Sequence, residues 1–194
     1  MRTLRRRMIR QSSLPTSYER LEYIENTSTA YIDCGLEPKH TFNYEIKTNA
    51  VTGNSVFGTS CLNEYTDYRF FCVNVNKLYF DVGNYRIISP QGVTFPYHAK
   101  FGNYYIQDLD NETNKVTGNT FGETLHGAKL GNLYLLFGHG NVKGKVWLLN
   151  INDNDKPIRK FIPAKRKSDG VIGMYDLVGR KFYTSPNGVA FTGG

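Results

Sequence analysis

Cysteine is scarce in this sequence. Only Cys34, Cys61 and Cys72 occur, and no two of them are spaced as a C-x-x-C pair. This number and spacing exclude a disulfide framework and a cysteine-rich zinc site, so we expect free thiols in a chain made in a reducing cytoplasm. A Cys61–Cys72 bridge between neighbouring strands stays open as an alternative.

Long apolar runs are missing too. No stretch is long enough for a transmembrane helix. A basic stretch opens the chain, but the apolar run of a secretory signal does not follow it. We therefore expect neither a membrane span nor a secretory signal.

Patterns that carry catalysis or metal binding are also absent. There is no G-x-S-x-G, and the four histidines, His40, His98, His126 and His139, lie far apart in the sequence. We expect them to be isolated loop or surface residues, although a cluster formed only in space stays open. The same scatter argues against zinc. The glycine-rich loop 138–144 lacks the spacing and the following helix of a phosphate-binding loop.

Strand-forming residues, in contrast, are abundant. The chain has 14 Tyr, 12 Phe and 19 Gly, and no segment keeps helical periodicity for three turns. Thirteen short segments, from TAYIDCG (29–35) to GVAFTGG (188–194), read as strands separated by turn residues. In FNYEIKTN (42–49) apolar and polar residues alternate, as in a strand with one buried face. These features predict an all-β fold of two packed antiparallel sheets.

Asn, Asp and Gly mark the sharpest turns. We expect a hairpin at NDND (152–155), because Asn and Asp tolerate the backbone angles of tight turns. Asp169-Gly170 and Asn187-Gly188 also predict two-residue hairpins. We further expect the terminal strands, YIDCG (31–35) and GVAFTGG (188–194), to pair with each other and protect a sheet edge.

The positive charge is concentrated at one end. Five arginines and no acid occur in the first ten residues, and they account for most of the net charge of +7. We divide the chain into a basic arm, residues 1–13, and a domain, residues 14–194. The arm would anchor the domain to an acidic groove of a protein assembly, with apolar help from Leu4, Met8 and Ile9. The anchoring residues would be Arg2, Arg5, Arg6, Arg7 and Arg10.

Nucleic acid is the other partner that clustered arginines suit. No aromatic residue is interleaved with the arginines, and the rest of the chain has no strong basic excess. We therefore regard nucleic-acid binding as the less favoured use of the arm.

Two sets of polar residues are candidate ligand sites. Tyrosines close to amides and carboxylates could form a sugar-binding groove, because tyrosine offers a flat apolar face and a polar tip. Ordinary strand packing is the alternative for each of them, and Tyr97 and Tyr105 belong to the same wider set. The predicted glycan-binding residues are Asn63, Tyr65, Asp67, Tyr68, Tyr85 and Tyr104.

The second set lies in the segment 150–155. Asn150-x-Asn152-x-Asn154 is spaced like the start of a calcium loop, but the glycine and glutamate that complete such a loop are missing. A plain turn is the favoured interpretation. Asp153 and Asp155 remain as candidate ligands for a structural calcium ion, and no other cofactor is expected.

Two long stretches resemble a known family. LPTSYERLEYIENTSTAYIDCG (14–35) and the segment 144–194, with GMYDLVGRKFY (173–183) near its end, are similar in order and separation to the two ends of concanavalin A-like lectin/glucanase domains of bacteriophage structural proteins and gut-bacterial surface proteins. The sequence departs from that pattern at residues 28–30 and at Cys34. The resemblance implies a jelly-roll sandwich over residues 14–194, a fold that does not by itself fix function.

The resemblance also bears on catalysis. Hydrolases with this sandwich carry an E-x-D-x-x-E strand that places carboxylates on one face, and this chain lacks it. The nearest acidic pair, Glu22 and Glu25, would point to opposite faces of a strand. We therefore expect no enzyme.

Together these observations predict a non-enzymatic structural protein of a bacteriophage virion, made in the cytoplasm of the host bacterium. It would be a capsid or tail decoration or fibre, held by residues 1–13 to other virion proteins. The domain would display a lectin-like surface toward bacterial glycans, and a homotrimer is one form it could take. The alternative is a carbohydrate-binding module of a bacterial surface protein.

Overall fold

The computed structural model describes residues 13–36, 39, 41–50, 52–58, 71–74, 77–82, 85–88, 96–102, 105–110, 115–117, 135–137 and 142–194. All regular secondary structure in these ranges is β-strand, and none of it is helix. The prediction of an all-β chain is therefore confirmed. The same ranges contain no helix that could cross a membrane.

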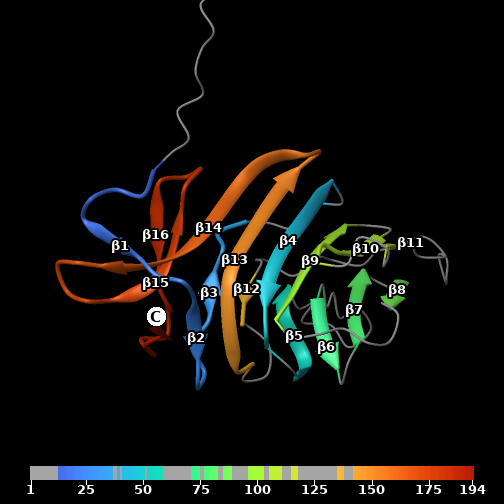
Figure 1. Cartoon of the computed structure of the whole chain (residues 1–194), viewed down its shortest axis with the longest axis horizontal. Coiled ribbons are helices and arrows are strands. Elements are labelled where there is room, and N and C mark those ends of the chain that lie inside the picture. The colour runs from blue at the N-terminus through green and yellow to red at the C-terminus, as the bar shows by residue number, and fades with distance from the viewer. Residues whose placement is uncertain are drawn as a thin grey trace, which may run out of the picture.

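The larger sheet has eleven strands, and eight of them follow one another across it in the order β11-β10-β9-β4-β13-β14-β15-β16 (Figure 1). All its pairings are antiparallel. The eight strands are β4 (Phe42–Thr48), β9 (Tyr97–Gly102), β10 (Tyr105–Asp108), β11 (Lys115–Thr117), β13 (Gly144–Asp153), β14 (Lys156–Arg166), β15 (Ile172–Asp176) and β16 (Lys181–Tyr183). Three short strands complete the sheet: β1 (Tyr18–Arg20) on β14, and β2 (Ile24–Asn26) between β13 and β17 (Thr192–Gly193).

The smaller sheet has six strands in the order β3-β12-β5-β6-β7-β8, again all antiparallel. Strands β5 to β8 follow one another along the chain, whereas β12 lies between β3 and β5, which come much earlier. The strands are β3 (Ile32–Asp33), β5 (Thr52–Gly58), β6 (Phe71–Asn74), β7 (Lys77–Val82), β8 (Tyr85–Ile88) and β12 (Leu135–Leu136).

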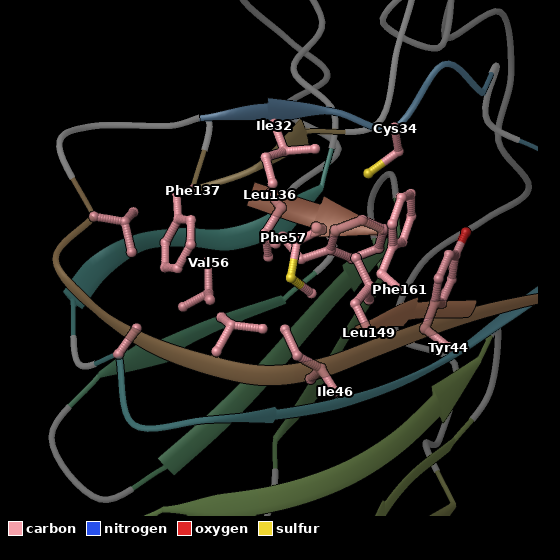
Figure 2. Packing of buried hydrophobic residues seen from close by; sticks show 14 of the residues in the cluster. Ile32, Cys34, Tyr44, Ile46, Val56, Phe57, Leu136, Phe137, Leu149 and Phe161 are labelled. Carbon is pink, nitrogen blue, oxygen red and sulfur yellow. The ribbon is translucent and has the colours of Figure 1, made fainter. Parts of the chain in front are cut away.

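One hydrophobic core joins the two sheets. Strand β4 alternates between buried and half-buried residues along its whole length, as its sequence predicts. Its Tyr44 lies fully buried, with its ring centroid 5.3 Å from that of Phe57 in the smaller sheet. Figure 2 shows Ile46 and Leu149 of the larger sheet facing Phe57 and Leu136 of the smaller one. Burying one such side chain stabilises the fold by about 1.5–3 kcal/mol.

A second, smaller cluster lies on the opposite face of the larger sheet. In β14 Phe161 belongs to the main core, so the next residue, Ile162, points to the other face. There the Tyr18 ring centroid lies 4.9 Å from that of Tyr175 and 5.0 Å from that of Phe182. We call this the satellite cluster, and it comprises Leu14, Tyr18, Ile162, Ala164, Tyr175, Leu177 and Phe182. The first described residues of the chain therefore cover the face of β14, β15 and β16.

The turn predictions had mixed outcomes. The hairpin at 152–155 is confirmed: Asn154 and Asp155 have φ of 46° and 64° and join β13 to β14 as a two-residue turn. Asp169-Gly170 also lies in a hairpin, but its loop is longer, because the last bond before it runs from Arg166 N to Val171 O. Asn187-Gly188 forms a turn without a hairpin, because β17 pairs with β2 and not with β16.

The predicted pairing of the terminal strands is wrong. Residues Ile32 and Asp33 form β3 in the smaller sheet, where they pair with β12. The C-terminal strand β17 pairs instead with Ile24 and Glu25 of β2, in the larger sheet. Both strands are only two residues long, and local sequence does not encode which of two nearby strands a terminal strand joins.

Candidate functional site

The outward face of the larger sheet carries a row of polar side chains. Phe42, Tyr44 and Ile46 point into the core, so Asn43 and Glu45, which alternate with them, point outward. The strands on either side continue the row in register. We call this surface the polar face, and its members are Asn43, Glu45, His98, Tyr105, Asn150 and Asn152.

Glu45 is the centre of the polar face. Its Oε1 lies 2.7 Å from His98 Nε2 on β9, and its Oε2 accepts a hydrogen bond of 2.9 Å from Asn150 Nδ2 on β13. An ionised carboxylate can only accept hydrogen bonds, so His98 donates through Nε2. Both oxygens of the carboxylate are therefore held by partners from the two neighbouring strands.

His98 has a second acidic neighbour. Its Nδ1 lies 3.7 Å from Asp110 Oδ1, so the imidazole stands between two carboxylates. Asp110 follows β10 and is exposed, whereas His98 and Glu45 are half-buried. The expectation that the histidines are isolated is therefore wrong for His98, because strand pairing brings it beside a residue 53 positions away.

A second row of the polar face crosses four strands. Tyr105 is opposite Gly102, and the register continues through Asn43 to Asn152. Asn152 Nδ2 donates to Asn43 Oδ1 at 2.8 Å, and Asn43 Nδ2 donates to Asp155 Oδ1 at 3.0 Å. Partial burial, and secondarily the charge of Asp155, raises the pKa of the Tyr105 hydroxyl, which stays protonated at neutral pH.

These groups suit recognition of hydroxyl-rich molecules. Amides donate and accept at once, and carboxylates add strong acceptors, which together match the mixed hydrogen bonding of sugar hydroxyls. Tyr105 adds an apolar ring beside them. Because the side chains already bond to one another across strands, they are held in place before a ligand arrives.

Most of the residues predicted for glycan binding lie outside the described residues, namely Asn63, Tyr65, Asp67, Tyr68 and Tyr104. Tyr85 begins β8, where it is opposite Val82 of β7. Of the wider set of tyrosines, Tyr97 is buried in the main core, while Tyr105 lies on the polar face. The anchoring arginines, Arg2, Arg5, Arg6, Arg7 and Arg10, also lie outside the described residues.

The two aspartates predicted for calcium have protein partners. Asp153 Oδ2 lies 3.9 Å from Lys39 Nζ, and Asp155 accepts from Asn43. Within the described ranges, no three His, Cys, Asp or Glu side chains are grouped so that they could hold a metal ion. Asp155 is thus held beside the polar face by its bond to Asn43.

Another cluster of charged groups is structural. Asp176 is fully buried and accepts from the backbone N–H groups of Lys160, Val178 and Gly179 at 2.9–3.0 Å. Arg159 Nε lies 3.5 Å from its Oδ2. The carboxylate thereby fixes the turn between β15 and β16, which explains the Tyr-Asp pattern near the end of the sequence.

Sequence reasoning missed Glu45, His98, Asn150 and Asn152 as members of one site. The alternation in 42–49 places Asn43 and Glu45 on one face, but their partners come from strands far along the chain. Asn150, for example, is 105 positions from Glu45. The short distances between these side chains follow from the register, which the sequence does not reveal.

Compared with protein-family models, curated proteins and solved structures, the chain gave no significant match.

Proposed function

We propose that this chain is a non-enzymatic structural protein of a bacteriophage virion whose β-sandwich binds glycans of the bacterial surface through the polar face. The domain would be a concanavalin A-like jelly roll. Two antiparallel sheets around one core are compatible with that fold, and the resemblance of both chain ends to the family favours it.

The polar face is the observation that carries the glycan proposal. Glu45, Asn150 and Asn43 are fixed by bonds of 2.7–3.0 Å to other side chains of the same surface. In a network with this geometry the donors and acceptors are already ordered, so little further side-chain entropy is lost when a ligand binds. Tyr105 at its edge supplies the ring against which a sugar would pack.

Binding without hydrolysis fits the state of the central carboxylate. Glycoside hydrolysis needs one acid and one base or nucleophile, held on opposite sides of the scissile bond. Glu45 uses both oxygens for His98 and Asn150. The nearby acid, Asp110, lies 3.7 Å from the far nitrogen of the same imidazole. This arrangement positions Glu45 as a fixed acceptor.

The arm completes the proposal. Residues 1–13 would attach the domain to other virion proteins, through charge-assisted pairs from the arginines to acidic groups. A trimer would bring three polar faces together and raise avidity for a repetitive glycan. The alternative is a carbohydrate-binding module of a bacterial surface protein. It would use the same polar face, but it would not explain the basic arm, which would have no virion protein to bind.

An array of purified lipopolysaccharide O-chains and capsular polysaccharides tests the glycan proposal. We expect the full chain to bind a subset of them, and Glu45→Gln and Asn43→Ala to weaken that binding at least about fivefold, in line with loss of one or two hydrogen bonds. Lys181→Ala, at the exposed first residue of β16, is the control and should bind as the parent does. Absence of binding to every polysaccharide, or equal binding by the polar-face variants, would refute the proposal.

Two further measurements address the rest of the proposal. Release of reducing ends from any bound polysaccharide by the purified chain would overturn the non-enzymatic assignment. Mass spectrometry of purified phage particles should find this chain as a component, whereas recovery from bacterial envelopes alone would favour the surface-protein alternative.

A further inference from the structure

A pair of large aromatic rings lies on the same outward face as the polar face. The register of β13 against β4 shifts between Val146 and Leu148, so that Trp147 is an extra residue without a partner on β4. Val146 and Leu149 both belong to the main core. The bulge therefore turns Trp147 and Leu148 outward together, which a regular strand would not do.

Tyr23 packs beside this tryptophan. The two ring centroids are 6.0 Å apart, with their planes tilted by 56°. Lys145 Nζ lies 3.9 Å from the centre of the Tyr23 ring, a cation–π contact. Tyr23 is held by its backbone, since its N–H and that of Glu22 both donate to Gly194 O.

The position of the rings relative to the polar face follows from strand alternation. Ile24 and Val146 are opposite one another and fully buried in the main core, so their neighbours Tyr23 and Trp147 point to the other side of the sheet. Glu45 and Asn150 occupy that same side. Along β13, Trp147 is three residues from Asn150, which corresponds to roughly 10 Å.

The composition of this surface is unusual for a solvent-exposed sheet. Tyr23 and Trp147 are only half-buried, although rings of this size normally gain most of their stabilisation by burial. Leu148, opposite Lys47 of β4, lies between them and Asn150 along β13, so apolar side chains lead along this strand to the polar face. A flat ring beside fixed amides is the combination that suits a sugar, whose ring faces are apolar and whose edges carry hydroxyls.

We infer that the polar face and the Trp147–Tyr23 pair form one elongated site, and that its ligand is an oligosaccharide of several sugar units whose far end stacks on these two rings. The inference rests on the proposed function and deepens it, because it specifies a chain rather than a single sugar. Tyr105 would hold one end of the ligand and Trp147 the other.

Chain length is the variable that tests this inference. The probes are a polysaccharide bound in the array and its size-fractionated fragments, from monosaccharide to hexasaccharide, titrated against the full chain by calorimetry. Trp147 is the single tryptophan of the sequence, so its fluorescence reports directly on the far end of the site. The variants are Trp147→Ala, Tyr23→Ala and Lys145→Ala. Lys181→Ala is the matched control, because Lys181 makes the same kind of contact with Tyr183, 5.0 Å from its ring centre, away from the polar face.

We expect affinity to rise by about tenfold or more between disaccharide and hexasaccharide, which corresponds to about 1.4 kcal/mol. Only the longer fragments should change the tryptophan emission. Trp147→Ala and Tyr23→Ala should remove the gain with length and leave disaccharide binding unchanged. Lys145→Ala, which removes the cation above the Tyr23 ring, should reduce the gain, and the Lys181→Ala control should keep it. Circular dichroism verifies that each variant is folded. If Trp147→Ala does not fold, Tyr23→Ala alone tests the inference.

Three results would overturn the inference. Equal affinity for short and long fragments, or a gain with length that survives in both aromatic variants, would refute the elongated site while leaving the proposed function intact. Absence of binding to any polysaccharide would refute the proposed function and this inference together.

Discussion

The ring of Tyr105 lies across Gly102 on the adjacent strand. A Cβ atom at Gly102 would come within 3.0 Å of Tyr105 Cε1 and 3.4 Å of Cζ, and within 3.4 Å of Asn43 Cβ. The missing side chain therefore leaves the space in which the tyrosine lies beside the amide of the polar face. A glycine inside a strand often marks such a close approach.

This relationship predicts the effect of Gly102→Ala. The added methyl group must displace the Tyr105 ring or Asn43, so we expect glycan affinity to fall several-fold. The fold itself should lose no more than about 1 kcal/mol, because alanine is the better strand residue and the ring can rotate away. Calorimetric titration and thermal unfolding measure the two effects. Unchanged affinity in Gly102→Ala would mean that the Tyr105 ring does not contact the ligand.

Asp176 should be essential for stability. Its carboxylate is fully buried and accepts from three backbone N–H groups, with Arg159 beside it. Asp176→Ala leaves those donors unsatisfied, so we expect the free energy of unfolding to fall by about 3 kcal/mol or more. Chemical denaturation measures this loss.

Asp169→Asn is the control for Asp176. Hydrogen bonds from Arg166 hold the pKa of the Asp169 carboxyl below its usual value, but this pair is exposed. The control should therefore change the stability far less than Asp176→Ala does, because exposed ion pairs contribute little. A similar loss in both variants would contradict the structural role given to Asp176.

The satellite cluster predicts where the chain can be shortened. Deleting residues 1–12 should leave the melting temperature unchanged and abolish incorporation into particles. Deleting residues 1–18 also removes Leu14 and Tyr18, which cover Tyr175 and Phe182, and should lower the melting temperature by several degrees. If the shorter deletion still entered particles at normal occupancy, the arm would not be the anchor.

Cys34 should be chemically silent in the folded protein. It is a free, fully buried cysteine, and burial raises the pKa of its thiol well above the usual range, with a smaller contribution from Asp33. The reactive thiolate is therefore scarce even in mildly alkaline buffer. In a variant with Cys61→Ser and Cys72→Ser, a thiol reagent should label the chain only after denaturation. Rapid labelling of the native variant would show that the core opens around Cys34.

The sequence was informative about local structure. Alternation in 42–49 correctly predicts the buried and outward faces of β4, and Asn154 and Asp155 form the expected tight turn. Such features depend on a few neighbouring residues, whose backbone preferences act locally.

The register of the strands and their long-range pairing could not be predicted from the sequence, because neither depends on neighbouring residues alone. The sequence does not indicate whether β17 pairs with β2 or with β3, and the bulge that turns Trp147 outward exists only relative to β4. Glu45 and His98 meet because β4 and β9 pair in one register; a shift by one residue would place either side chain on the opposite face. The candidate site therefore had to be found from the pairing of strands.

The satellite cluster also governs how the domain would stand on a particle. It occupies β14, β15 and β16 on the same side of the sheet as the polar face, which extends across β13, β4 and β9 to β10. An attachment that continues from Leu14 would hold the molecule at the β16 end. A sheet lying flat on its support with this side down would hide its own ligand site. If the proposed attachment and glycan binding hold, the domain would therefore have to stand upright, with the β10 end of the polar face farthest from the support.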